Sequence, residues 1–155
     1  MLQERRAGFG DAAARGIPTH ITLLPPTEVD GGSLPAIEAH LAEVAASGRL
    51  FAMRLSGTGT FRPLSPVVFV QVVEGAEEPA HGSRSEYVTL PGRSPGAAVP
   101  VPPHVTVAHG IAEEAMDRAF EELADYEAAW PCTELRPVRA GRGRGLAEAA
   151  GLHLR

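Results

Sequence analysis

The sequence predicts an α+β domain made of two similar halves, each with a short strand followed by a helix. The first observation is a repeated unit, His-Ile-Thr at 20–22 and His-Val-Thr at 104–106, entered through a proline-containing dipeptide and continued by aliphatic residues. Short β-branched and aliphatic runs of this kind are typical of strands. The second observation is a helical pattern after each unit, over 33–48 and 112–129. This duplicated order predicts two lobes within one domain, residues 1–155.

The first half has a clear order of elements. They are a helix over 2–15, a strand carrying 20–22 and ending at Pro25-Pro26, a helix over 33–48, a strand over 50–55, a turn at 57–60 and a strand over 67–73. Ser33 is a candidate cap of the middle helix and Gly48 its end. That helix has one apolar stripe, formed by Leu34, Ile37, Leu41 and Val44.

The second half is less regular. A strand over 102–108 and a helix over 112–129 are expected, with Met116, Phe120 and Leu123 facing inward. Residues 74–101 are dense in Pro, Gly, Ser and Arg, and a loop of this length is unusual inside a compact domain. Residues 134–155 are rich in Arg and Gly, and we expect them to be irregular with a terminal helix.

Composition excludes several classes of protein. The chain has 155 residues, is 44% hydrophobic and has a formal net charge of −5, which is typical of a soluble globular domain without an overall basic face for long nucleic acid. There is no lysine, so a lysine nucleophile and a Walker lysine are excluded. The single Cys132 allows no intramolecular disulfide and no cysteine zinc site, and we expect it to lie in or beside a strand.

No apolar run is long enough to span a bilayer, and the first residues lack the apolar core of a signal peptide. We therefore expect a cytoplasmic protein with no membrane contact, and a monomer.

The repeated units have a chemical meaning. Residues two apart in a strand point to the same face. His20 and Thr22 should project together, as should His104 and Thr106, while the aliphatic residues between them face a core. Two imidazoles and two hydroxyls suit general acid–base chemistry on a phosphate. The alternative is a repeat that only serves the strands.

The paired stretches His20–Pro26 and His104–His109 resemble the motifs of the two-histidine phosphoesterase superfamily, and its LigT-like 2′-5′ RNA ligases and RNA 2′,3′-cyclic phosphodiesterases in particular. The resemblance covers residues 1–73 and 102–133. It implies a bilobal α+β fold with mostly antiparallel sheets around a central cleft, and metal-free, cofactor-free chemistry on RNA ends or cyclic-phosphate nucleotides. Relatives begin with a strand, so the first strand is expected to be missing here.

The resemblance also implies roles for the four motif residues. His20 and His104 would be the catalytic pair, with His104 as the base for water and His20 as the acid. Thr22 and Thr106 would donate hydrogen bonds to the phosphate oxygens. The residues themselves do not distinguish the acid from the base.

Three more residues are candidates for substrate contact. Phe61 and Arg62 lie between two expected strands and could offer a stacking ring and a guanidinium; the alternative is a packed Phe and a solvated Arg. His109 lies five residues after His104, so a regular strand would turn it away. No histidine, cysteine or carboxylate cluster has the spacing of a metal site.

Two functions therefore compete. The first is an RNA-processing phosphoesterase that hydrolyses or reversibly ligates 2′,3′-cyclic or 2′-5′ phosphodiester ends. The second is a protein that binds nucleotides or RNA ends without turnover. An inactive truncated fragment is the third possibility.

Overall fold

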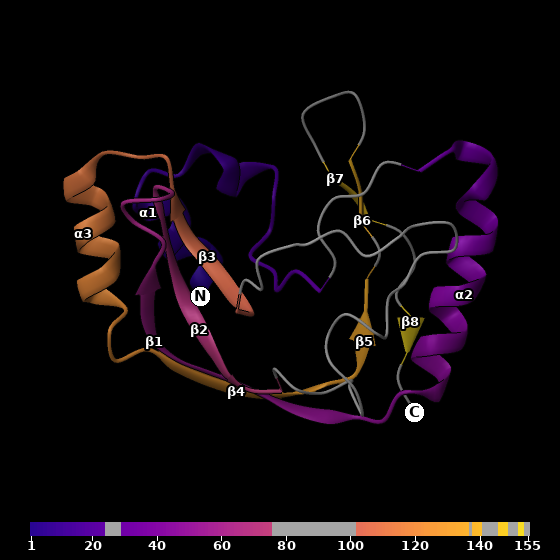
Figure 1. The fold of residues 1–155 in the computed structure, drawn as a ribbon. Coiled ribbons are helices and arrows are strands. Elements are labelled where there is room, and N and C mark those ends of the chain that lie inside the picture. Colours follow the sequence, from indigo (N-terminus) through magenta and orange to yellow (C-terminus); the bar gives the residue numbers. More distant parts are fainter. Residues whose placement is uncertain (24–28, 76–101, 137, 141–145, 149–151, 154–155) are drawn as a thin grey trace.

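Two groups of elements form two lobes, and β1 (Phe51–Thr60) and β4 (Glu127–Cys132) run from one to the other (Figure 1). The computed structural model describes residues 1–23, 29–75, 102–136, 138–140, 146–148 and 152–153. The expected strand end at Pro25-Pro26, most of the irregular segment 74–101, and residues 141–145 lie outside these ranges.

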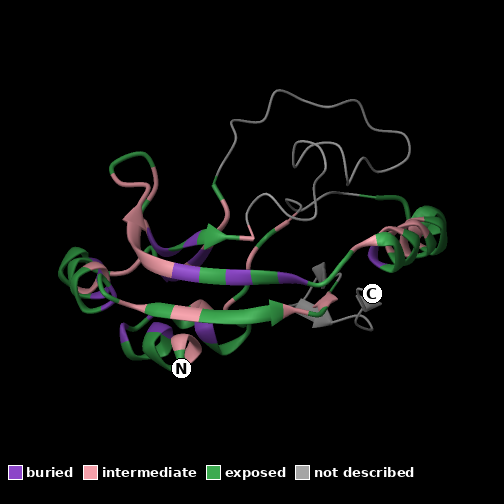
Figure 2. Ribbon diagram, turned by 90° about the horizontal axis from the view of Figure 1, so that it is seen from below, coloured by how far each residue is buried: buried purple, intermediate pink, exposed green. Residues whose placement is uncertain are grey.

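The first lobe contains a four-stranded antiparallel sheet in the order β3-β2-β1-β4, with β2 at Val67–Glu74 and β3 at His104–His109. Helices α1 (Leu2–Gly8) and α3 (Glu113–Glu122) cover one face, and buried and exposed residues alternate along the strands (Figure 2). The core between them is built from apolar side chains, the largest fully buried ones being Leu55, Met116, Leu123, Val68, Val70 and Val107. Burying each such side chain stabilises the fold by about 1.5–3 kcal/mol.

The second lobe contains α2 (Leu34–Ser47) and two small antiparallel pairs. The pairs are β5 (Glu134–Leu135) with β8 (Leu152–His153), and β6 (Val138–Ala140) with β7 (Leu146–Glu148). The expected stripe of α2 is half-buried, and the helix ends before Gly48 as predicted. The expectation of an irregular segment with a terminal helix over 134–155 is wrong for the residues of these four strands. Their backbone groups are satisfied by pairing with another strand, which composition alone does not reveal.

Glycine conformation explains two further differences from expectation. The predicted helix 2–15 is divided into α1 and a 3₁₀ turn (Ala12–Arg15), because Gly10 adopts a φ of +93° that an α-helix cannot contain. The turn predicted at 57–60 is part of β1. A bulge shifts the β1–β2 register between Leu55 and Thr58, and Gly57 supplies the positive φ of +70° there.

The predicted helix 112–129 ends at Glu122, seven residues early. Residues 127–132 instead form β4, whose backbone pairs with Phe51–Ser56 of β1. Local helix propensity at Ala128 and Ala129 is therefore overridden by pairing with a distant strand. The expected inward residues are confirmed: Met116 and Leu123 are buried, and Phe120 packs against the same core.

Among the described helices, none has the length and apolar character needed to cross a membrane.

Candidate active site

The second His-aliphatic-Thr unit lies on β3, the strand at one end of the four-stranded sheet. Val105 and Val107 are buried in the core at 4% and 0% exposure. His104 and Thr106 therefore project from the opposite face, where both remain partly exposed.

The first unit meets the second through a single antiparallel bridge between Ile21 and Val105. The described part of the chain shows no continuous strand at 20–22, so that prediction holds only for the one bridging residue. In antiparallel pairing the flanking residues also lie opposite each other, which sets Thr22 across from His104 and His20 across from Thr106. Ile21 packs against the core, as Val105 does.

This register brings the four motif side chains to one face. His20 and His104 are diagonal neighbours, for which Cα atoms lie about 7–8 Å apart. Each histidine thus has the threonine of the other unit opposite it on the shared face.

Side chains of α1 hold the chain that leads into His20. The Gln3 Oε1 accepts a hydrogen bond from the Thr19 amide at 2.7 Å, and the Arg6 guanidinium donates to the Ile17 carbonyl at 3.2 Å. Arg6 is itself fixed by a buried ion pair with Asp11 at 2.8 Å. Removing one partner of a buried pair costs about 3–5 kcal/mol, so α1 is firmly tied to the segment before the first motif.

Both motif histidines make the same hydrogen bond. The Nδ1 atom of His20 lies 2.7 Å from the Pro18 carbonyl oxygen, and the Nδ1 atom of His104 lies 2.8 Å from the Pro102 carbonyl oxygen. A carbonyl can only accept, so Nδ1 carries the proton in each case. In the neutral imidazole the lone pair is then on Nε2, the atom available to a substrate.

Aromatic rings surround His104. Its ring centroid lies 5.1 Å from that of Phe61, edge to face, and 5.0 Å from that of Phe69. The two phenylalanine rings are 4.5 Å apart. Phe69 lies over Gly59 of β1, where a Cβ atom would be 2.5 Å from the ring. The structure therefore places Phe61, a predicted substrate contact, against a predicted catalytic histidine.

Arg62 points toward α3. Its Nη1 atom is 2.8 Å from a carboxylate oxygen of Glu113 and 2.8 Å from one of Asp117. The hydrogen bonds that it donates to Asp117 and then to Glu113 raise the pKa of the guanidinium above its usual value. The guanidinium is therefore ion-paired with α3 and not purely solvated.

His109 ends β3 and is exposed. The β2–β3 register shifts between Val68 and Phe69, so Val67 pairs with His109 while Phe69 pairs with Thr106. This bulge restores His109 to the face of Thr106, where a regular strand would have turned it away. It lies at the far end of the strand from His104.

Sequence reasoning missed Gln71, which pairs with His104 across β2 and β3 and so shares its face. Its side-chain amide donates to the Thr58 carbonyl at 3.0 Å. The available signal was a single polar residue inside the apolar run 67–73.

Within the ranges that the structure describes, no group of three or more His, Cys, Asp or Glu side chains could hold a metal ion. Cys132 is the last residue of β4 and half-buried, as expected of a small side chain beside a strand. Burial raises the pKa of its thiol, which disfavours a thiolate nucleophile.

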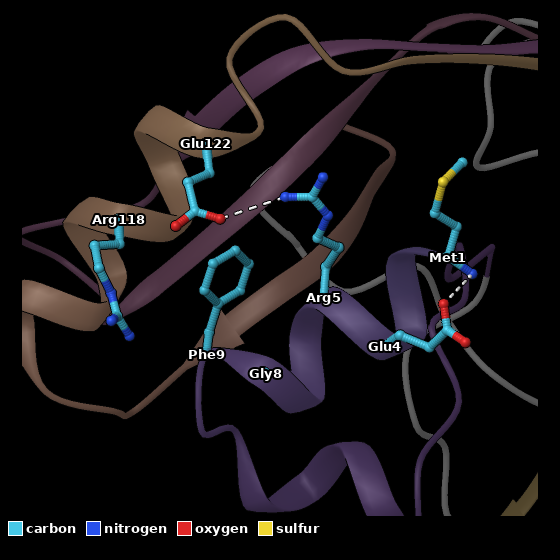
Figure 3. A pocket seen from close by; sticks show the side chains of 7 residues that line it. All are labelled: Met1, Glu4, Arg5, Gly8, Phe9, Arg118 and Glu122. Atoms are coloured by element: carbon cyan, nitrogen blue, oxygen red, sulfur yellow. Dashed lines mark hydrogen bonds and ion pairs between the residues drawn. The ribbon is translucent and has the colours of Figure 1, made fainter.

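A hollow between α1 and α3 contains none of the candidate residues (Figure 3). An ion pair between Arg5 and Glu122, 3.3 Å apart, crosses it. The candidate site is therefore the open face of the sheet, not this hollow.

The chain belongs to the 2′-5′ RNA ligase superfamily, whose family model matches residues 2–144. This confirms the resemblance and supports a phosphoesterase or ligase role. Among solved structures, the fold is similar to that of TT0787 of Thermus thermophilus, with 22% sequence identity and a TM-score of 0.54 over 99% of this chain and 93% of that chain. The expected α+β fold is thereby confirmed. No curated protein matches the chain.

Proposed function

We propose that this protein hydrolyses, or reversibly ligates, 2′,3′-cyclic or 2′-5′ phosphodiester bonds at RNA ends by two-histidine acid–base catalysis. The observation that carries the proposal is the bridge between Ile21 and Val105, which gathers both His-aliphatic-Thr units on one face. The matching Nδ1 bonds to Pro18 and Pro102 support it, because they leave both Nε2 atoms for chemistry.

For hydrolysis of a cyclic phosphate we assign His104 as the base and His20 as the acid. The neutral His104 Nε2 removes a proton from water as the water oxygen bonds to phosphorus. The protonated His20 Nε2 gives its proton to the departing ribose oxygen as that phosphorus–oxygen bond breaks. Ligation is the same sequence with the hydroxyl of a second RNA end in place of water: its oxygen bonds to phosphorus as the cyclic phosphorus–oxygen bond breaks.

The threonine hydroxyls complete the site. In this proposal Thr22 and Thr106 donate to the non-bridging phosphate oxygens, where negative charge increases in the transition state. Because the chain has a net charge of −5, recognition would depend on these local donors. The proposed partners are RNA ends or cyclic-phosphate nucleotides, and the proposed working form is a cytoplasmic monomer without metal or cofactor.

The test is turnover of an oligonucleotide ending in a 2′,3′-cyclic phosphate, with identification of the product. Replacing His20 or His104 by Ala should each lower turnover by about 10²–10⁴-fold. The double variant should lose less than the product of the two factors, because the pair acts as a unit. His40→Ala, on α2 in the second lobe, is the matched control and should keep full activity.

Full turnover in either single variant would contradict the assignment. Binding of the cyclic-phosphate end by the parent protein without any product over hours would instead favour the non-catalytic binding protein.

A further inference from the structure

We propose that Arg62 is a positioning residue: its bonds to α3 fix the turn 61–66 so that Phe61 holds the His104 ring in its reacting orientation. This inference rests on the proposed function, and it removes Arg62 from the substrate contacts. The Arg62 Nη1 atom donates to Glu113 and to Asp117, both at 2.8 Å.

The turn 61–66 is also held by hydrogen bonds to residues outside α3. The Thr60 hydroxyl accepts from the Arg62 amide at 3.1 Å and from its Nε at 3.3 Å, and donates to the Val67 carbonyl at 2.8 Å. The Gly110 amide, between β3 and α3, donates to the Pro66 carbonyl at 3.0 Å. The turn is therefore joined to the strand that carries His104 and to the helix that follows it.

Phe61 links the fixed turn to His104 through the contact between their rings. The imidazole has one edge fixed by Pro102 through Nδ1, while the rings of Phe61 and Phe69 contact it from the sides. Moving Phe61 would free the imidazole to rotate about its χ2 angle and turn Nε2 away from phosphorus. A displacement of about 1 Å at a reacting group can cost on the order of 10²-fold in rate.

Charge argues against a direct role in phosphate binding. One guanidinium faces two carboxylates, so the cluster of Arg62, Glu113 and Asp117 has a net charge of −1 by count of these three side chains. Glu113 and Asp117 are both exposed, and the cluster would repel a phosphate that approached it.

The two roles of Arg62 predict opposite results when the carboxylates are removed. If Arg62 positions Phe61, Glu113→Gln/Asp117→Asn should lower kcat about 10- to 100-fold with little change in KM, and Arg62→Gln should do the same. If Arg62 binds substrate, freeing it from the carboxylates should lower KM and leave kcat unchanged, which would overturn the proposal.

Arg5→Gln is the matched control, because the Arg5–Glu122 pair also joins α3 to a neighbouring element (Figure 3) and neither residue is among the aromatic or hydrogen-bond partners of His104. It should keep the parent kcat and KM. A loss in Arg5→Gln equal to that in Arg62→Gln would show a general effect of loosening α3, and would overturn the proposal.

A spectroscopic readout separates this inference from the proposed function. The ring protons of His104, assigned by their loss in His104→Gln, should shift in Arg62→Gln because Phe61 moves, and should not shift in Arg5→Gln. Shifted signals in a protein with no phosphodiesterase activity would retain the positioning role and reject the function. Unshifted signals would overturn the positioning role. Should Arg62→Gln fail to fold, Asp117→Asn alone carries the same measurements with one ion pair kept.

Discussion

Replacing Gly59 by Ala tests the packing that surrounds His104. A Cβ atom at this position would lie 2.5 Å from Cε2 and Cζ of Phe69, well inside van der Waals contact. The ring has little room to retreat, since Phe69 is 5% exposed and its centroid lies 4.5 Å from Phe61 and 5.0 Å from His104. Overpacking of this kind costs about 1–3 kcal/mol. For a domain of this size, that lowers the melting temperature by about 2–12 °C.

The assay is a thermal unfolding curve followed by circular dichroism, together with turnover of the cyclic-phosphate oligonucleotide. Gly8→Ala is the control, because a Cβ at Gly8, the last residue of α1, meets nothing within 4 Å. It should melt at or slightly above the parent temperature. Gly59→Ala/Phe69→Leu should recover part of the stability lost in Gly59→Ala by removing the clashing atoms. A Gly59→Ala protein with the parent melting temperature would refute the reasoning.

The remaining predictions concern chemistry. Thr22→Val and Thr106→Val should each lower turnover about 10- to 1000-fold by deleting one donor to the phosphate, and full activity in either would mark the unit as scaffold. The rate should be bell-shaped in pH, because one imidazole must be neutral and the other protonated; a flat profile would count against the pair. Activity should survive EDTA, and loss with recovery on adding zinc or manganese would reject metal-free chemistry. The raised pKa of Cys132 should make its alkylation at pH 8 slower in the folded than in the urea-unfolded chain; equal rates would contradict its burial. The stability linked to this thiol is present below the unfolded pKa and lost as pH rises through the folded one.

The repeated motif and the strong periodic patterns could be predicted from the sequence. β2, β3 and α2 appear within one or two residues of their expected places, because their apolar periodicity reports directly on burial. The faces of His104 and Thr106 also follow from strand alternation alone. The motif alone did not predict which residue of one unit lies opposite which residue of the other. That register depends on the bridge between Ile21 and Val105, which joins segments far apart in the chain.

Elements whose conformation depends on distant pairing were predicted wrongly. The first half of β4, residues 127–129, lies where the local sequence favours helix, and its strand conformation comes from pairing with β1. The bulge in β1 was predicted as a turn because glycines such as Gly57 and Gly59 are common in turns. In the structure, the lack of a side chain at Gly59 makes room for the ring of Phe69. The contact of Phe61 with His104 could not be predicted for the same reason: residues from separate strands come together only when the sheet register is known.

The proline carbonyls that hold the two imidazoles have a consequence for which histidine acts as the acid and which as the base. The carbonyls of Pro18 and Pro102 fix the same tautomer in both histidines. His20 and His104 would therefore offer the phosphate equivalent Nε2 atoms, one from each side. The two motif histidines differ in the side chains around them. Among the described residues, His104 contacts the rings of Phe61 and Phe69, whereas His20 is exposed. We therefore expect that the orientation in which an RNA end enters, with its aromatic base toward or away from those rings, determines which histidine delivers the proton and which one receives it.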